Sequence, residues 1–123
     1  MQYLLLIHDD PQLWADMSDD ERNAYFGEYM EYTQALTDAG VYVGGNQLQG
    51  TDTATTVRVR DGETLTTDGP FAETKEQLAG YYLIEAESLD EALEWGARIP
   101  SALIGTIEVR PVVPTRVPAE AAG

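Results

Sequence analysis

The chain has 123 residues and carries 22 acidic against 7 basic side chains, which gives a formal net charge of −15. That length is typical of one domain with one hydrophobic core. So negative a surface repels phosphate backbones and anionic lipids, which argues against binding to nucleic acid or to membranes.

The sequence contains no cysteine and a single histidine. Disulfides, thiolate metal sites and cysteine nucleophiles are therefore excluded, and we expect neither a metal nor a cofactor. No apolar run approaches the roughly 20 residues of a membrane span. The apolar opening over residues 3–7 lacks the basic start of a signal peptide, so we predict a cytoplasmic protein.

The first half of the chain predicts a strand, a helix and a second strand. Residues 2–8 are apolar on both faces, as in an interior strand, and residues 12–17 form a connecting turn. A capping box beginning at Ser18 starts a helix that ends near Ala39, before Gly40. We assign its buried stripe to Phe26, Met30, Thr33 and Leu36, with core tyrosines alongside at Tyr25, Tyr29 and Tyr32. Residues 41–48 follow as a strand.

The second half predicts a hairpin, a strand, a helix and a final strand. Asp61-Gly62 lies between two alternating runs, residues 55–60 and 63–67, which indicates a β-hairpin. Residues 80–86 are again apolar on both faces. A second capping box at Ser88 starts a helix that runs to about Arg98, whose inward residues we assign as Leu89, Ala92, Leu93 and Gly96. Residues 105–112 form the last strand, and residues 113–123 a loose tail beyond a single domain over 1–112.

This order, β-α-β, an inserted hairpin, then β-α-β, predicts the α+β class with the ferredoxin-like split βαβ plan. The two strands that are apolar on both faces are then the central ones. Two helices cover one face of the sheet and nothing covers the other. Because a bare apolar sheet face is an interaction site, we expect a homodimer packed through its sheets, that is, a dimeric α+β barrel.

Residues 66–81 connect the hairpin to the next strand through an unusually polar segment. Asp68-Gly69-Pro70 is a strong turn signal. It is followed by five polar or charged residues over 73–77, which include the only lysine of the chain, Lys75. A plain connection between strands needs no such density of functional groups, so we place a candidate ligand cleft under this segment.

Residues 68–76, Asp-Gly-Pro-Phe-Ala-Glu-Thr-Lys-Glu, resemble the signature of the DGPF (DGPFAETKE) proteins in the larger YCII-related group. The resemblance also covers residues 3–7, the pair Gly44-Gly45 and residues 107–111, and extends over most of residues 1–111. It implies the same dimeric α+β barrel. Most proteins of the DGPF type have no assigned reaction, so the resemblance implies a fold more than an activity.

The candidate site residues come from this segment and from the lone histidine. His8 is either a general base or metal ligand beside Asp9 or Asp10, or a histidine bonded to backbone or water. Asp68 is a site carboxylate or a turn cap, and Lys75 an ammonium aimed into the cleft or a solvated ion pair. We name His8, Asp68 and Lys75 as catalytic candidates. The ligand-binding candidates are Gly69, Pro70, Phe71, Glu73, Glu76 and Tyr81.

Some proteins of the YCII-related group resemble lyases that use a histidine on the first helix and an aspartate just before a proline after the second helix. Here those positions fall near Gly27 or Glu28 and on Ile99, before Pro100. Both catalytic partners are missing, so we do not transfer a dehalogenase or muconolactone-type lyase activity to this chain.

Three hypotheses for function remain. The first is a dimer that binds a small polar metabolite under the signature segment, with cofactor-free acid–base chemistry of the isomerase or lyase kind. The second, implied by the resemblance, is a non-catalytic regulatory or sensor module associated with an extracytoplasmic-function sigma factor. The third is a structural dimer without a ligand.

Overall fold

The computed structural model describes residues 1–114 of the chain. Residues 115–123 of the predicted tail therefore lie outside the described residues. The strands are β1 (Gln2–Asp9), β2 (Tyr42–Gln47), β3 (Thr55–Arg60), β4 (Glu63–Asp68), β5 (Gln77–Glu85) and β6 (Thr106–Pro111). The helices are α1 (Pro11–Ala15), α2 (Asp19–Asp38) and α3 (Leu89–Ala97), with short 3-10 turns η1 (Thr51–Thr53) and η2 (Pro100–Leu103).

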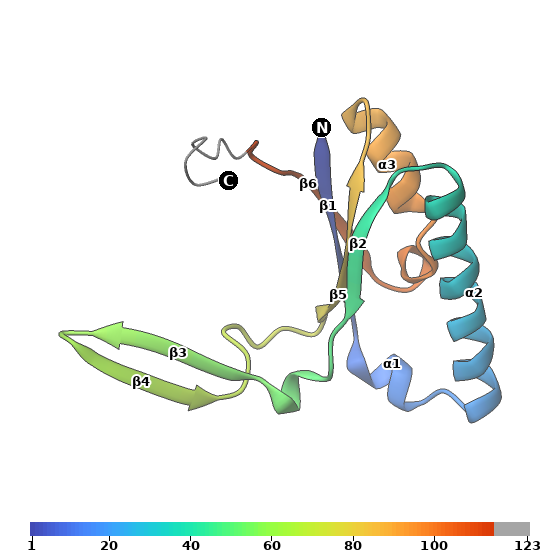
Figure 1. Cartoon of the computed structure of the whole chain (residues 1–123). Coiled ribbons are helices and arrows are strands. Elements are labelled where there is room, and N and C mark those ends of the chain that lie inside the picture. Colours follow the sequence, from blue (N-terminus) through green and yellow to red (C-terminus); the bar gives the residue numbers. More distant parts are fainter. Residues whose placement is uncertain (115–123) are drawn as a thin grey trace.

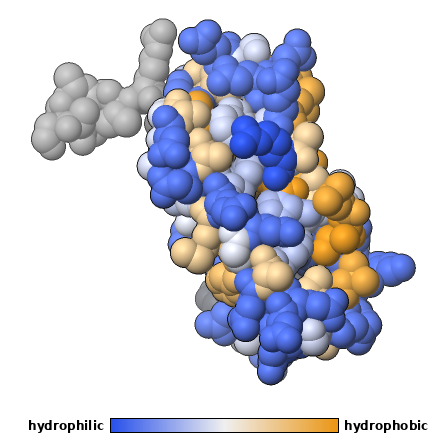
Figure 2. All heavy atoms as spheres, turned by 90° about the vertical axis from the view of Figure 1, so that its right-hand side faces the viewer, coloured by the Kyte–Doolittle hydropathy of each residue, from blue (hydrophilic) through white to orange (hydrophobic). Residues whose placement is uncertain are grey.

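Four strands form an antiparallel sheet in the order β2-β5-β1-β6, and β3 and β4 pair separately as a hairpin. The predicted α+β class is confirmed, and the first and third core strands are central, as expected. All three helices lie on one side of the sheet, while the β3–β4 hairpin reaches away on the other side (Figure 1). Figure 2 looks onto the helix side, where hydrophobic surface gathers along one border of a mostly polar face.

The alternation of β1 decides which face carries the core. Tyr3, Leu5 and Ile7 are buried toward the helices, while Leu4 and Leu6 on the opposite face are only half-buried. This is the period of two that a strand imposes on its side chains. The core as a whole consists of Tyr3, Leu5, Ile7, Tyr32, Leu36, Tyr82, Ile84, Ala86, Ala92 and Ile99.

The predicted buried stripe of α2 is wrong at two positions. Phe26 is 50% exposed and Met30 is 70% exposed, whereas Tyr32 is 5% exposed and Leu36 is fully buried. The helix is turned so that its tyrosines point inward, where their hydroxyl groups find partners in η2 and α3. The hydroxyl of Tyr32 donates to the backbone oxygen of Trp95 at 2.8 Å.

Helix α3 also turns a different face inward from the one predicted. Leu89 and Leu93 of α3 are 46% and 47% exposed, and Ala92 and Gly96 are the residues that pack inward. Small residues there let the helix approach β6 closely. A Cβ atom on Gly96 would lie only 3.1 Å from a methyl group of Val109.

Several boundaries shift without changing the plan. The short helix α1 begins at Pro11 and occupies much of the segment over residues 12–17 that was expected to be a turn. Strand β5 begins at Gln77 rather than at residue 80. Both predicted caps are present: the hydroxyls of Ser18 and Ser88 accept from the backbone N–H groups of Glu21 and Glu91 at 3.1 Å. Within residues 1–114, no helix is long and apolar enough to cross a membrane.

Replacing a leucine at the contact between α2 and the sheet should destabilise the fold. Leu36 is fully buried, so Leu36→Ala should lower the free energy of unfolding by about 2–5 kcal/mol. The matched control is Leu103→Ala, since Leu103 is 91% exposed and its loss should cost no more than about 0.5 kcal/mol. Urea denaturation of both variants measures this, and equal losses would contradict the assignment of the core face.

Candidate functional site

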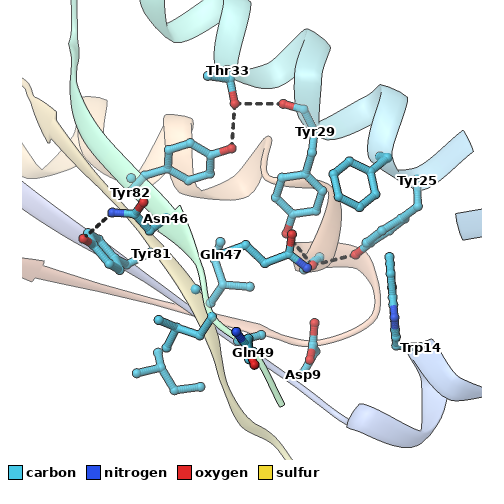
Figure 3. A pocket seen from close by; sticks show the side chains of 18 of the residues that line it. Asp9, Trp14, Tyr25, Tyr29, Thr33, Asn46, Gln47, Gln49, Tyr81 and Tyr82 are labelled. Atoms are coloured by element: carbon cyan, nitrogen blue, oxygen red, sulfur yellow. Dashed lines mark hydrogen bonds between the residues drawn. The ribbon is translucent and has the colours of Figure 1, made fainter. Parts of the chain in front are cut away.

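A cavity of about 820 Å³ lies on the helix side of the sheet, between α2, α1 and the β2 edge (Figure 3). Aromatic side chains from α1, α2 and β5 form much of its wall, namely Trp14, Tyr25, Phe26, Tyr29 and Tyr82. Asp9, at the end of β1, and Ser101, in η2, add polar groups. The cavity is therefore apolar over most of its wall, with a few polar atoms directed inward, which is the usual make-up of a small-molecule site.

The sequence Asp9-Asp10-Pro11 positions one wall of the cavity. The side chain of Asp10 caps α1 by accepting from the backbone N–H of Gln12 at 2.9 Å. That cap starts the short helix that carries Trp14. Asp9 lies one residue earlier, on the same face of β1 as Ile7, so its carboxyl group is directed to the helix side. The two adjacent aspartates thus have different roles, the first at the cavity and the second at the helix cap.

Three hydroxyl groups meet at one end of the cavity. The hydroxyls of Tyr25 and Tyr29 lie 2.6 and 2.5 Å from the hydroxyl of Ser101. Ser101 is the one buried polar residue of the described chain, at 1% exposed. Three hydroxyls carry three hydrogens and these two hydrogen bonds use two of them. The third hydrogen can join Tyr25 to Tyr29, whose hydrogen bond partly opposes the rise in the pKa of Tyr25.

Burial keeps these phenols in their neutral form. It raises the pKa of Tyr25 and, more strongly, that of Tyr29, and the hydrogen bonds to Ser101 only partly oppose this. The negative charge of Asp9 raises the pKa of Tyr25 further, which places that carboxylate within electrostatic reach of the phenol. Around neutral pH the tyrosines can donate hydrogen bonds but do not act as bases.

Asp9 is the one carboxylic acid among the residues that line the cavity. Burial raises its pKa above the ordinary 3.8, the neighbouring charges of Glu76 and Asp10 raise it further, and His8 lowers it. Its carboxylate accepts no hydrogen bond from any residue within 1–114. A carboxyl group with a raised pKa in a cleft is a candidate for proton transfer, because its two protonation states are closer in free energy near neutral pH.

The turn at the start of the signature segment supports the hairpin. Asp68 is exposed and ends β4, and Gly69 has a φ of 107°, which favours glycine. The backbone N–H of Gly69 donates to the oxygen of Ala54 at 2.8 Å, and its own oxygen accepts from the hydroxyl of Thr56 at 2.7 Å. These bonds join the two ends of the hairpin. Asp68, Gly69 and the half-buried Pro70 are absent from the cavity wall.

The rest of the signature segment is mostly exposed. Phe71 is 80% exposed and lies under the guanidinium of Arg58, 5.7 Å from its ring centre. Glu73 and Lys75 are exposed as well, and Lys75 forms no ion pair with any residue of 1–114. These residues too lie away from the cavity wall.

Glu76 and Tyr81 are the two predicted ligand residues with a link to the cavity. Glu76 accepts from the hydroxyl of Thr106 at 2.7 Å, and its charge acts on Asp9. Tyr81 is part of the wall near the β2 edge, where its hydroxyl accepts from the amide nitrogen of Asn46 at 2.9 Å.

His8 lies on the opposite face of β1 from Ile7 and so outside the cavity wall. Its Nε2 atom is buried, has no hydrogen-bond partner in the described part of the chain, and lies 3.9 Å from a carboxylate oxygen of Glu108. No group of three or more potential metal-ligating side chains occurs among residues 1–114. None of His8, Asp68 and Lys75 lies on the wall of this cavity.

Sequence reasoning missed the residues that define this cavity. Tyr25 and Tyr29 were interpreted as core packing, and Ser101 was not considered. The i, i+4 spacing of the two tyrosines indicated a shared helix face, but no pattern indicated which group their hydroxyls would meet. The positions expected for a lyase pair stay without catalytic side chains: Gly27 and Glu28 lie on α2, and Ile99 is 1% exposed in the core.

The raised pKa of Asp9 makes a prediction about stability and pH. Since the fold favours the protonated form, stability is lost as pH rises from the ordinary value of 3.8 through the raised value. Asp9→Asn removes that loss, so the variant should melt above wild type at about pH 7, and the difference should vanish at about pH 3. The control Glu94→Gln removes an exposed charge from α3 and should shift melting little. An Asp9→Asn variant that melts lower than wild type at neutral pH would contradict this account.

Comparison with known proteins places the chain in a family. A protein of Rhizobium meliloti (strain 1021), described only as uncharacterized, is 38% identical over 114 residues, covering 91% of this chain and 92% of the relative. Among solved structures, the 5-chloro-2-hydroxyhydroquinone dehydrochlorinase (TftG) from Burkholderia phenoliruptrix AC1100, in complex with 2,5-dihydroxybenzoquinone, superposes with a TM-score of 0.55. That match covers 92% of this chain and 94% of the other at 18% identity, so it concerns the fold alone.

The family model of the YCII-related domain matches residues 1–116. This range contains every described strand and helix, and with them the cavity. The chain belongs to the YCII-related family.

Proposed function

We propose that this protein binds a small, flat, partly polar ring molecule in the cavity beside α2. The observation that carries the proposal is the wall itself, which combines Trp14, Tyr25 and Tyr29 with one carboxylate and the buried hydroxyl of Ser101. Aromatic walls bind ring compounds through area and stacking geometry, and the two polar groups fix their orientation.

The size of the cavity agrees with such a ligand. Small-molecule sites range over about 300–1,000 Å³, and this one encloses about 820 Å³. The dehydrochlorinase of similar fold holds 2,5-dihydroxybenzoquinone, a molecule of one six-membered ring. That ligand supports the size class, whereas the enzyme's reaction is not carried over, because the lyase pair is absent here.

We further propose that Asp9 transfers a proton to or from the bound ring molecule without a cofactor. A hydroxyl of the Tyr25–Ser101–Tyr29 group, by turning its hydrogen toward the ligand, would stabilise the negative charge that develops on a ligand oxygen. This places the acid–base step on the helix side. The set predicted from sequence, His8, Asp68 and Lys75, stays a prediction, and none of its three residues lies on the wall of this cavity.

A homodimer that packs sheet against sheet is part of this proposal. The face of the sheet opposite the helices carries Leu4, Leu6 and Leu83, and no described helix covers it (Figure 1). Burying these side chains would stabilise a dimer, and the resulting arrangement would be the dimeric α+β barrel expected from the sequence.

The alternative, a regulatory module that acts with an extracytoplasmic-function sigma factor, draws on the hairpin. Val57 and Val59 are 61% and 60% exposed on one face of β3. A protruding strand pair with an apolar face is a surface for another protein. Such a module would not need a ligand in the cavity, so binding experiments separate the two functions.

Trp14 reports directly on the cavity, because the other tryptophan, Trp95, lies away from it, packed beside Tyr32 and Arg98. In Trp95→Phe, addition of phenol, benzyl alcohol or 2-phenylethanol should change the tryptophan emission to a saturating limit. In Trp14→Phe, where Trp95 is the remaining reporter, the same additions should produce little change. Unsaturated, equal responses in both variants would overturn the proposed function.

Light scattering after gel filtration tests the dimer. Wild type should elute with twice the chain mass of 13.5 kDa at micromolar concentration. Leu6→Glu places a charge in the middle of the uncovered sheet face and should yield a folded monomer, as checked by circular dichroism. Leu103→Glu, at a 91% exposed site, should remain dimeric. A monomeric wild type would exclude the barrel.

A further inference from the structure

The charge of the cavity wall is one-sided. Asp9 is the single charged residue among the residues that line it, and the wall contains no lysine, arginine or histidine. Arg22 lies nearby, with its guanidinium 5.8 Å from the centre of the Trp14 ring, but this group already has partners within the fold. It donates to the backbone oxygens of Trp14 and Ala15 and lies 3.5 Å from a carboxylate oxygen of Asp19.

An anionic ligand would therefore meet no positive partner inside the cavity. Its own charge would face the Asp9 carboxylate, the neighbouring charges of Glu76 and Asp10, and a protein of net charge −15. Desolvating an anion without a counter-charge is costly, and like charges add to that cost. We therefore expect small carboxylates and phosphates to bind poorly in this cavity.

Asp9 itself lacks a partner. Its carboxylate accepts no hydrogen bond within the described chain, and burial together with two neighbouring acids disfavours its charge. A positive group beside Asp9 would offset the cost of its negative charge, because an opposite charge at hydrogen-bond distance stabilises the ionised carboxylate.

The aromatic rings add a second attraction for a cation. Trp14 and Tyr25 meet edge to face with their centres 6.1 Å apart, and Tyr25 and Tyr29 do so at 5.4 Å. Rings set at such angles present both faces and edges to the space between them. Ring faces attract cations, tryptophan most strongly, and the effect grows when water is excluded.

We propose that the ligand of this cavity is a cation: a small ring-bearing amine whose ammonium group pairs with the Asp9 carboxylate while its carbon skeleton lies against Trp14, Tyr25 and Tyr29. This inference rests on the proposed function, since it specifies the ligand class of the same cavity. It also gives Asp9 a role in the resting complex, as the counter-ion that holds the ligand in one orientation.

Three probes of nearly equal size and shape test the charge. They are 2-phenylethylamine, 2-phenylethanol and phenylacetate, which are positive, neutral and negative at neutral pH. With the Trp14 emission of Trp95→Phe as the signal, the amine should bind at least about tenfold more tightly than the alcohol, as expected for a charge-assisted hydrogen bond. Phenylacetate should bind more weakly than the alcohol.

Asp9→Asn in the same background should abolish the preference for the amine over 2-phenylethanol. Glu94→Gln loses one unit of negative charge as well, but at an exposed position on α3 away from the wall. It should keep the preference, which separates local pairing with Asp9 from attraction by the net charge.

The outcomes distinguish this inference from the function on which it rests. If the alcohol binds and the amine binds no better, the cavity is a ring-binding site and the cationic ligand class is wrong. If phenylacetate binds best, the class is likewise wrong. If none of the three probes gives a saturable Trp14 signal, the proposed function itself fails. A preference for the amine that survives in Asp9→Asn would overturn the pairing with Asp9.

Discussion

Hydrogen bonds from α2 hold the helix against η2, α3 and β5, and the cavity depends on the spacing that they set. Tyr25 and Tyr29 reach Ser101 in η2, Tyr32 reaches the backbone oxygen of Trp95, and Thr33 bonds to the hydroxyl of Tyr82 at 2.7 Å. The distance between packed elements follows the size of the side chains at their contact. A helix that packed through leucine alone would lie closer and fill the space with its own atoms.

The same spacing explains why an aspartate can persist at the end of β1. Water and the mouth of the cavity leave the Asp9 carboxyl group half-buried rather than enclosed, so its charge costs stability without preventing folding. Residues that cost stability in the free protein and have no structural partner are frequent at functional sites, since their interactions are completed by the ligand. The adjacent Asp10 differs in this respect, because its carboxylate caps α1 and is stabilised by a hydrogen bond within the fold.

The two faces of the sheet have separate tasks. On the helix side the buried face of β1 carries the core and leads into the cavity. On the other side are the half-buried leucines, His8 with Glu108, and the hairpin with its signature turn. The polar density of residues 73–77 therefore belongs to a connection that starts on the hairpin side and ends at the cavity, where Gln77 is part of the wall and the charge of Glu76 acts on Asp9.

The sequence by itself determined the class, the order of the elements, both helix caps, the hairpin and the central position of the two strands that are apolar on both faces. These features follow from local periodicity and from turn and cap chemistry, which act over a few residues. It did not determine the rotation of α2, where Phe26 and Met30 turned outward. Nor did it determine that Tyr25 and Tyr29 would meet Ser101, which lies more than seventy positions further along the sequence. Only the tertiary structure decided these, because a helix with apolar residues on several sides is oriented by the hydrogen bonds and shapes of whatever it packs against.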